Sequence, residues 1–402
     1  MADEEKIHSL RERLLFTIGG ILGAIFILGG VFLGAFIHRT LGIINDSYLQ
    51  SVSRANAQET KTTFAKAYTD CLSLARSVGL TGSFPEEYRR NHINDTLKQT
   101  LKAHSEYVDA WFVSEPNAID GLDDDFAGTE GYDESGRMIP YWTNINGNID
   151  YSPLTDYVGS FWYENPLHSQ EGVLIEPNLY ELQGKQMFVG GVAAPVRSPD
   201  GKTLGSIGLD FDWASVSQNL KKSKIFNTGY FILISDGGLV AAGPRESDIG
   251  NPSKILEGNK SLFANAKNNL ANFSFEDKDA VLGKKCRYFV EPFKIGNAKE
   301  TWFLAVVAPV SEMNSKKNAP LTAIIITFII SLLVGIGISG YVITKTVLQI
   351  RDCADAMKNI AQGDGDLTVQ LKIHHNDELG LLSKYFNQTM DKIRTSISSV
   401  NT

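Results

Sequence analysis

Two long apolar runs divide the chain into a short polar start, a large polar middle region and a polar C-terminal segment. The runs span residues 14–37 and 319–344, and neither contains a charged residue. About 20 helical residues cross the hydrocarbon core of a bilayer, so both runs predict transmembrane helices. Both are apolar on every face, which is typical of membrane helices rather than of surface helices. The first run is also longer than the apolar core of a cleaved signal peptide.

Basic residues gather beside the two runs, on the sides away from the middle region. They are Lys6, Arg11, Arg13, Lys345, Arg351 and Lys358. Because basic residues close to membrane helices mark the cytoplasmic side, residues 1–13 are expected in the cytoplasm and residues 38–318 outside it. The segment after the second run returns to the cytoplasm.

The middle region begins with a helical pattern and continues with short alternating runs. Residues 43–78 contain no Pro or Gly, and their apolar positions recur every three or four residues, which predicts a long stalk helix. A second helix is predicted over 91–104. Expected strands cover 108–113, 137–142, 174–176, 187–193 and 204–210, then 230–241 as a hairpin, 272–275, 285–290 and 301–308. The prediction is an α+β membrane protein with two antiparallel-sheet modules, a distal one at about 80–215 and a proximal one at about 225–310.

Apolar residues recur at steps of three and four behind the second run. One series runs from Ile343 to Ala361, and another from Leu379 to Val400 repeats every seven residues. These patterns predict two amphipathic coiled-coil helices joined by a connector long enough to leave them parallel. A seam this narrow is not buried within one chain, so a homodimer forming a four-helix bundle is expected.

The connector carries a motif of glycines and acidic residues. It reads Gly363-Asp-Gly-Asp-Leu-Thr368 and is followed by Asp377-Glu-Leu-Gly380 and Phe386-Asn387. This segment resembles a HAMP domain, the signal relay of bacterial receptors, and its form is most similar to that of methyl-accepting chemotaxis proteins. The resemblance implies a HAMP domain over residues 345–398. The residues it implies for the relay are Gly363, Asp366, Leu367 and Glu378. The proline that many HAMP domains carry just after the membrane is absent near Val347-Leu348.

The middle region resembles the double Cache domain, a pair of PAS-like modules on a long helix. The motifs are Gly136-Arg-Met-Ile-Pro-Tyr-Trp142, Trp162-Tyr-Glu-Asn-Pro166, Glu176-Pro177 and Gly205-Ser-Ile-Gly-Leu-Asp210. The resemblance implies a sensor over residues 38–318 of a protein in the bacterial inner membrane, with the sensor periplasmic or extracellular and the HAMP domain cytoplasmic.

Aromatic residues with polar groups concentrate in the distal module and suit a small-molecule pocket. The candidate ligand-binding residues, with nearby polar groups, are Trp111, Arg137, Tyr141, Trp142, Tyr157, Trp162, Tyr163, Glu176, Asn178, Tyr180 and Asp210. The alternative for the aromatic residues is an ordinary sheet core. The expected ligand is an amine, an amino-acid-like molecule or an organic acid.

Some Cache domains that resemble this one bind free amino acids. In their pattern a basic residue two positions before the tryptophan holds the ligand carboxylate, and a strand-end Asp holds the amine. Trp162 and Asp210 match, but Ser160 replaces the basic residue. Asn178 and Tyr180 stand where that pattern has Tyr and Asp. Without the cation, bidentate capture of a carboxylate is lost. Asp210 and Glu176 remain candidates for facing an ammonium, and Arg137 for an anion.

Composition excludes several other functions. The net charge of −8 argues against nucleic acid as a partner. No cysteine–histidine cluster predicts a metal, and no cofactor is expected. The run Asp123-Asp-Asp125 lacks the ligand spacing of a calcium loop, so a solvated acidic turn is favoured. No catalytic motif predicts an enzyme.

The expected function is that of a chemoreceptor-type sensor. Ligand binding in the distal module shifts the second membrane helix, and the HAMP domain passes the change to cytoplasmic chemotaxis proteins. No signalling module is recognised before Thr402, so the chain is expected to lack one. The alternatives are the input half of a sensor histidine kinase or diguanylate cyclase, and a solute-binding envelope protein without signalling.

Overall fold

The computed structural model describes residues 10–362, 366–373 and 376–400. Lys6 and Gly363, which the sequence analysis singled out, lie outside the described residues. The chain forms two compact units, a sensor unit over Ile43–Lys316 and a membrane and relay unit that combines Met1–Gly42 with Lys317–Thr402.

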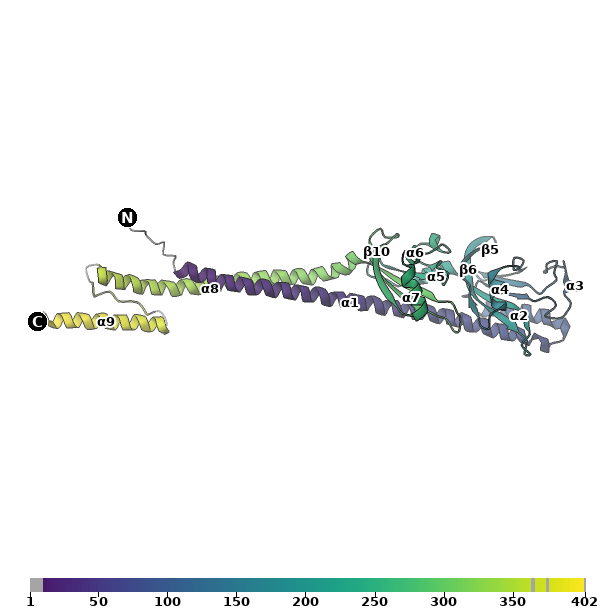
Figure 1. Cartoon of the computed structure of the whole chain (residues 1–402), viewed down its shortest axis with the longest axis horizontal. Helices are drawn as coiled ribbons and strands as arrows, with labels where there is room; N and C mark the ends of the chain where they lie inside the picture. Colours follow the sequence, from purple (N-terminus) through teal and green to yellow (C-terminus); the bar gives the residue numbers. More distant parts are fainter. Residues whose placement is uncertain (1–9, 363–365, 374–375, 401–402) are drawn as a thin grey trace. The chain divides into compact units, whose positions relative to one another are not determined.

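A single 70-residue helix, α1 (Leu10–Gly79), holds the first apolar run and the predicted stalk. Within the sensor unit, Ala57, Phe64, Cys71 and Val78 are buried at intervals of seven residues. This spacing keeps one face of the helix against its neighbours, as expected from 3.6 residues per turn. The stalk packs on both modules through that face, and Figure 1 shows it passing beside both sheets.

The distal module is a seven-stranded antiparallel sheet. Its strands run in the order β3-β2-β1-β7-β6-β4, with β5 also paired to β6. They are β1 (Asp109–Ser114), β2 (Pro140–Ile145), β3 (Asn148–Pro153), β4 (Val173–Leu174), β5 (Asn178–Leu182), β6 (Lys185–Arg197) and β7 (Thr203–Asp212). The strand predicted at 137–142 begins at Pro140, because Gly136 has a φ of +58° and ends a turn. The helices of the distal module are η1 (Leu80–Ser83), α2 (Glu86–Ala103), α3 (Asp123–Phe126) and α4 (Phe161–Leu167).

The proximal module is a five-stranded antiparallel sheet in the order β10-β11-β12-β8-β9. Its strands are β8 (Tyr230–Ile234), β9 (Val240–Ala242), β10 (Phe273–Lys278), β11 (Lys285–Phe293) and β12 (Trp302–Pro309). Helix α5 (Trp213–Lys222) links the modules, and η2 (Glu246–Asp248), α6 (Lys254–Gly258) and α7 (Lys260–Asn269) follow β9. Strand β12 is buried along its whole length and leads directly into α8.

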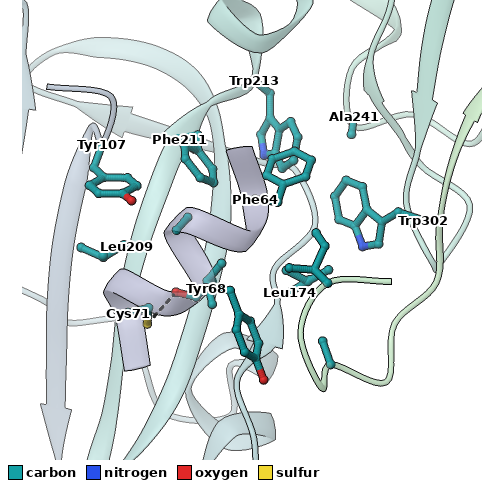
Figure 2. Close-up of a cluster of buried hydrophobic side chains, with 14 of the residues drawn as sticks. Phe64, Tyr68, Cys71, Tyr107, Leu174, Leu209, Phe211, Trp213, Ala241 and Trp302 are labelled. Carbon is teal, nitrogen blue, oxygen red and sulfur yellow. Dashed lines mark hydrogen bonds between the residues drawn. The ribbon is translucent and has the colours of Figure 1, made fainter. Parts of the chain in front are cut away.

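An aromatic cluster joins the two modules to the stalk. The indole of Trp213, at the end of the distal sheet, stacks on that of Trp302 at the start of β12, with centroids 5.3 Å apart and planes 18° apart. The Phe64 ring of α1 lies 5.6 Å and 5.8 Å from these two rings (Figure 2). The core is therefore continuous from one module to the other.

The membrane and relay unit is helical. Helix α8 (Val310–Gln362) carries the second apolar run and continues beyond it, and α9 (Glu378–Val400) follows the connector. Cys353 and Ala356 of α8 pack with Phe386 and Met390 of α9. The predicted seam differs on α8, because Ala354 and Met357 are exposed. The residues of α8 that pack on α9 each precede the expected residue by one position in the sequence.

Candidate functional site

A cavity of about 230 Å³ opens in the distal module. Its wall includes aromatic residues from three separate elements, Trp111 of β1, Tyr141 of β2 and Trp162 of α4. Tyr180 of β5 and Asp210 of β7 complete the set of predicted site residues that line it. These five come from distant parts of the sequence and meet because β1 pairs with both β2 and β7.

Asp210, which lines this cavity, has a second and fully buried aspartate, Asp109, as its neighbour. Asp109 and Asp210 are paired directly across β1 and β7. Asp109 Oδ2 accepts a hydrogen bond from the Tyr141 hydroxyl at 3.1 Å, and Asp210 Oδ2 accepts one from Trp111 Nε1 at 3.2 Å. The Oδ1 atom of each aspartate is buried, and the neighbouring carboxyl group in its protonated form is its one available donor within the described chain.

Burial favours the neutral form of both aspartates. It raises the pKa of Asp109 well above the ordinary value, and the charge of Asp210 raises it further. Burial also raises the pKa of Asp210, against hydrogen bonds from Trp111 and Asp109 that lower it. Two carboxyl groups this close do not both ionise easily without a cation, so the pair holds a proton until a positive group arrives.

The wall contains four aromatic residues, Trp111, Tyr141, Trp162 and Tyr180, and no basic side chain. Trp111 and Trp162 meet edge to face with ring centroids 4.9 Å apart. Gly208 makes room for this arrangement, because a Cβ there would lie 2.3 Å from the Trp111 ring. None of the residues that line the cavity is Lys, Arg or His. The cavity is therefore acidic at its base and rich in π-faces, which attract cations.

Three of the predicted residues form a separate cluster outside this cavity. The Arg137 guanidinium donates to the Ser114 carbonyl and to the Tyr163 hydroxyl, and lies 4.9 Å from the centre of the Tyr157 ring. Tyr163 in turn donates to Glu115. Arg137 is thus engaged within the protein and does not face the cavity.

Three further predicted residues also lie outside the cavity. Trp142 packs against α2, where its Nε1 donates to Asn94 Oδ1 at 3.1 Å. The Asn178 amide donates to the carbonyl of Glu176 at 3.1 Å. The Glu176 carboxylate accepts from the backbone N–H of Gly237, in the proximal module, at 2.6 Å.

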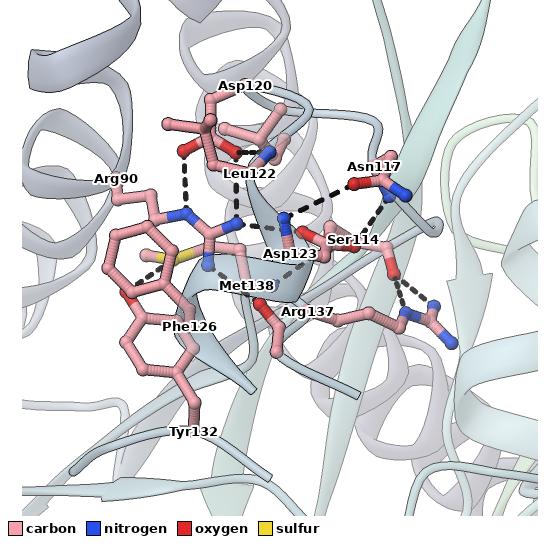
Figure 3. A network of polar contacts seen from close by, with 12 residues as sticks. Arg90, Ser114, Asn117, Asp120, Leu122, Asp123, Phe126, Tyr132, Arg137 and Met138 are labelled. Carbon is pink, nitrogen blue, oxygen red and sulfur yellow. Dashed lines mark hydrogen bonds and ion pairs between the residues drawn. The ribbon is translucent and has the colours of Figure 1, made fainter. Parts of the chain in front are cut away.

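The acidic run of residues 123–125 is not simply a solvated turn. Asp123 is buried, and its carboxylate accepts a hydrogen bond from the Arg90 guanidinium at 2.7 Å, beside a bidentate pair between Arg90 and Asp120 (Figure 3). The guanidinium carbon lies 4.0 Å from the centre of the Phe126 ring. The expected solvated turn is corrected for Asp123, which completes a buried ion-pair network at the tip of the distal module.

One group of side chains has the spacing of a metal site. Ligand atoms of Asp70, His104 and Glu106 lie within 4.8 Å of one another. The Lys66 ammonium already pairs with Glu106, and the Tyr107 hydroxyl donates to Asp70 at 2.6 Å. These partners neutralise and occupy the carboxylates, so the group carries no metal assignment here.

A larger cavity, of about 500 Å³, lies in the proximal module. Its buried carboxylate, Asp279, accepts hydrogen bonds from the hydroxyls of Tyr230 and Tyr288 at 2.6 and 2.8 Å and from two backbone N–H groups. Both oxygens of Asp279 are therefore satisfied, in contrast to those of the distal pair.

Asp109, the buried partner of the cavity residue Asp210, was not selected by the sequence analysis. The available signal was a charged residue within the apolar strand 108–113. A buried strand position that carries a carboxylate is rare unless the group is paired.

The comparisons with known proteins agree with this architecture. Residues 342–395 match the HAMP domain family, which confirms the predicted relay domain. Methyl-accepting chemotaxis protein TlpQ of Pseudomonas aeruginosa is 24% identical over 354 residues, which are 77% of this chain and 47% of that protein. The chain thus spans about half the length of this curated relative.

Solved sensor domains share the fold of the middle region. Methyl-accepting chemotaxis protein X superposes with a TM-score of 0.59 at 24% identity, over 67% of this chain and 99% of that structure. The periplasmic sensory domain of the Campylobacter jejuni chemoreceptor Tlp1 gives 0.55 at 18% identity, over 66% and 95%.

The chain combines a Cache-like region with two candidate membrane helices and a HAMP domain. Two apolar helices, each long enough to span a bilayer, flank a Cache-like α+β region, and a HAMP domain follows the second. The chain is a transmembrane receptor similar to methyl-accepting chemotaxis proteins, with its sensor region on the periplasmic side and its HAMP domain in the cytoplasm.

Proposed function

We propose that this chain is the sensing and relay part of a chemoreceptor that binds a small organic cation in the distal cavity. The observation that carries the proposal is the buried pair of carboxyl acceptors Asp109 and Asp210, of which Asp210 lines the cavity. An ammonium group in the cavity satisfies such acceptors and removes the repulsion between the two carboxyl groups.

Anions fit this site poorly. A ligand carboxylate needs a basic partner, and none lines the cavity. Arg137, the predicted candidate for that role, is occupied by Ser114 and Tyr163. Of the ligand classes that the sequence left open, amines are therefore favoured over amino-acid-like molecules and organic acids.

The relay segment supports a role in signalling rather than catalysis. Leu367 packs on the α8–α9 core, and Asp366 accepts a hydrogen bond from the backbone N–H of Thr368 at 2.9 Å. Glu378 begins α9 and is exposed. Ile350 and Met357 also expose apolar side chains, which supports a homodimer that covers this face and passes the signal to cytoplasmic partners.

The test compares cations with neutral molecules of the same shape. Choline and 3,3-dimethylbutan-1-ol differ only in N⁺ for C, and putrescine and 1,4-butanediol differ in NH₃⁺ for OH. Isothermal titration of the full chain in lipid nanodiscs should show binding of at least one cation and none of its neutral partner. Equal binding within both pairs, or binding of succinate in preference to either cation, refutes the proposal.

A further inference from the structure

Residues 171–176 connect α4 to β5 and have contacts on both modules of the sensor unit. The flanking elements carry Trp162 and Tyr180, and Ile175 within the segment also lines the distal cavity. The backbone N–H of Ile175 bonds to the carbonyl of Gly191, which fixes the segment to the sheet. Because Ile175 is part of the cavity wall, a ligand that displaces the wall also displaces this segment.

The far end of the segment contacts a turn of the proximal module. Glu176 Oε1 accepts from the Gly237 N–H at 2.6 Å, and a Cβ on Gly237 would lie 2.6 Å from the same oxygen. No side chain fits between the two groups. The next residue toward the N-terminus, Asp236, accepts from the backbone N–H of Thr301 at 2.8 Å.

A second set of contacts starts from Glu171. Its carboxylate accepts from the Asn297 amide at 3.1 Å and from the Tyr68 hydroxyl of the stalk at 3.4 Å. Gly172 donates its N–H to the same hydroxyl at 3.2 Å. Asn297 lies in the loop between β11 and β12, so this set reaches the same strand as the first.

Both sets of contacts converge on the start of β12. Thr301 directly precedes β12, whose first residue, Trp302, stacks on Trp213 (Figure 2). Strand β12 continues into α8 without an intervening residue, and α8 carries the second apolar run. A displacement at residues 171–176 therefore has a short, continuous route of contacts to the helix that enters the membrane.

We propose that Glu176 is the coupling residue of the sensor, which transmits the occupancy of the distal cavity to β12 through its bond to Gly237. The inference rests on the proposed function in one respect, namely that the natural signal is a ligand in that cavity. Coupling requires a difference in free energy between two arrangements of the junction, and the charge-assisted bond of Glu176 is well placed to supply it.

The test uses Glu176→Ala and a matched control, Glu164→Ala. Glu164 is an exposed residue of α4 in the same module, and its side chain has no hydrogen bond or ion pair to the proximal module among the described residues. Amide hydrogen exchange is followed at Thr301 and along β12 in the full chain in nanodiscs. Choline and putrescine are the probes.

With a bound probe, exchange at Thr301 and β12 should change by about fivefold or more in the wild type and in Glu164→Ala. In Glu176→Ala the probe should still bind and still protect the distal strands, while the response of β12 falls well below that of Glu164→Ala, because the Glu171 contacts alone remain. An unchanged response of β12 in Glu176→Ala overturns the proposal.

A second arm needs no ligand. Ile175→Ala removes part of the cavity wall, and its effect on exchange at Thr301 is measured in the Glu164→Ala and Glu176→Ala backgrounds. The proposal requires a clearly larger effect in the first background than in the second, and equal effects overturn it. Failure of both probes to bind the wild type counts against the proposed ligand class alone, because the ligand-free arm still decides the coupling.

Discussion

Replacement of Asp210 by Asn tests the acidic site most directly. Asp210 is 8% exposed, and its side chain is hydrogen-bonded to Trp111 Nε1 and to the carboxyl group of Asp109. Asn keeps the shape of the side chain and an acceptor oxygen but removes the charge. Loss of one partner from a buried charge pair costs about 2–5 kcal/mol. Since about 1.4 kcal/mol is a factor of ten, the Kd for a bound cation such as choline should rise by about 30-fold or more.

The matched control is Asp156→Asn in the same cavity. Asp156 lines the rim and is exposed. An exposed charge pair contributes at most about 1 kcal/mol, so the Kd should change by about fivefold or less. Both variants are compared with the wild type by isothermal titration at pH 7.5. Equal effects of the two substitutions would refute the reasoning from burial, as would unchanged affinity in Asp210→Asn.

The direction in which cation affinity changes with pH is an independent test of the acidic site. Burial holds the pKa of Asp109 and of Asp210 above the ordinary carboxyl value of about 3.9. The folded protein therefore binds more protons than the unfolded chain between the ordinary and the raised pKa, and its free energy of unfolding falls as the pH rises through that window. Cation affinity should rise over the same window, because the bound cation favours the ionised pair. Asp210→Asn should weaken both trends, whereas an affinity that does not change with pH contradicts the assignment.

Three further substitutions test the placement of individual residues. Arg90→Ala leaves Asp120 and Asp123 as buried carboxylates without their cation, and should lower the free energy of unfolding by about 3–5 kcal/mol in denaturant titrations. Gly136→Ala should also destabilise strongly and lower the melting temperature, because φ is +58° and a Cβ there would lie 1.8 Å from the Asp123 carbonyl oxygen. Trp142→Phe removes the bond to Asn94 outside the cavity, so it should leave cation affinity unchanged while it lowers the melting temperature; weaker binding would place Trp142 in the site after all.

The membrane helices and the sheet cores could be predicted from sequence because their patterns are local. An uncharged run of about 20 residues has few alternatives to a membrane helix. Strands β6, β7 and β12 contain continuous apolar runs, and β11 alternates between buried and less buried positions. The strands β3 and β5 were missed because much of their surface is exposed and polar. They are held by their neighbours β2 and β6 rather than by an apolar pattern of their own.

The candidate site was only partly predictable, because residue type does not reveal which face of a strand meets the cavity. Tyr141 and Trp142 are adjacent in β2, so their side chains point to opposite faces of the sheet. Tyr141 lines the cavity, whereas Trp142 packs on α2. Pairing across strands is likewise invisible in a single sequence, and this hid the partnership of Asp109 with Asp210.

The two cavities of the sensor unit show why a buried carboxylate is not by itself a mark of a ligand site. Asp279 in the proximal cavity is as deeply buried as the distal pair, yet two tyrosine hydroxyls and two backbone N–H groups satisfy it within the chain. Its role is complete when the protein folds, since it holds the loop between β10 and β11. Asp109 and Asp210 each receive one hydrogen bond from another side chain, Tyr141 or Trp111, and otherwise face each other, so ionising both costs free energy in the empty state. A cation that enters the distal cavity recovers this free energy on binding. The adjacent segment with Ile175 and Glu176 is the part of the wall through which, in our proposal, binding displaces β12.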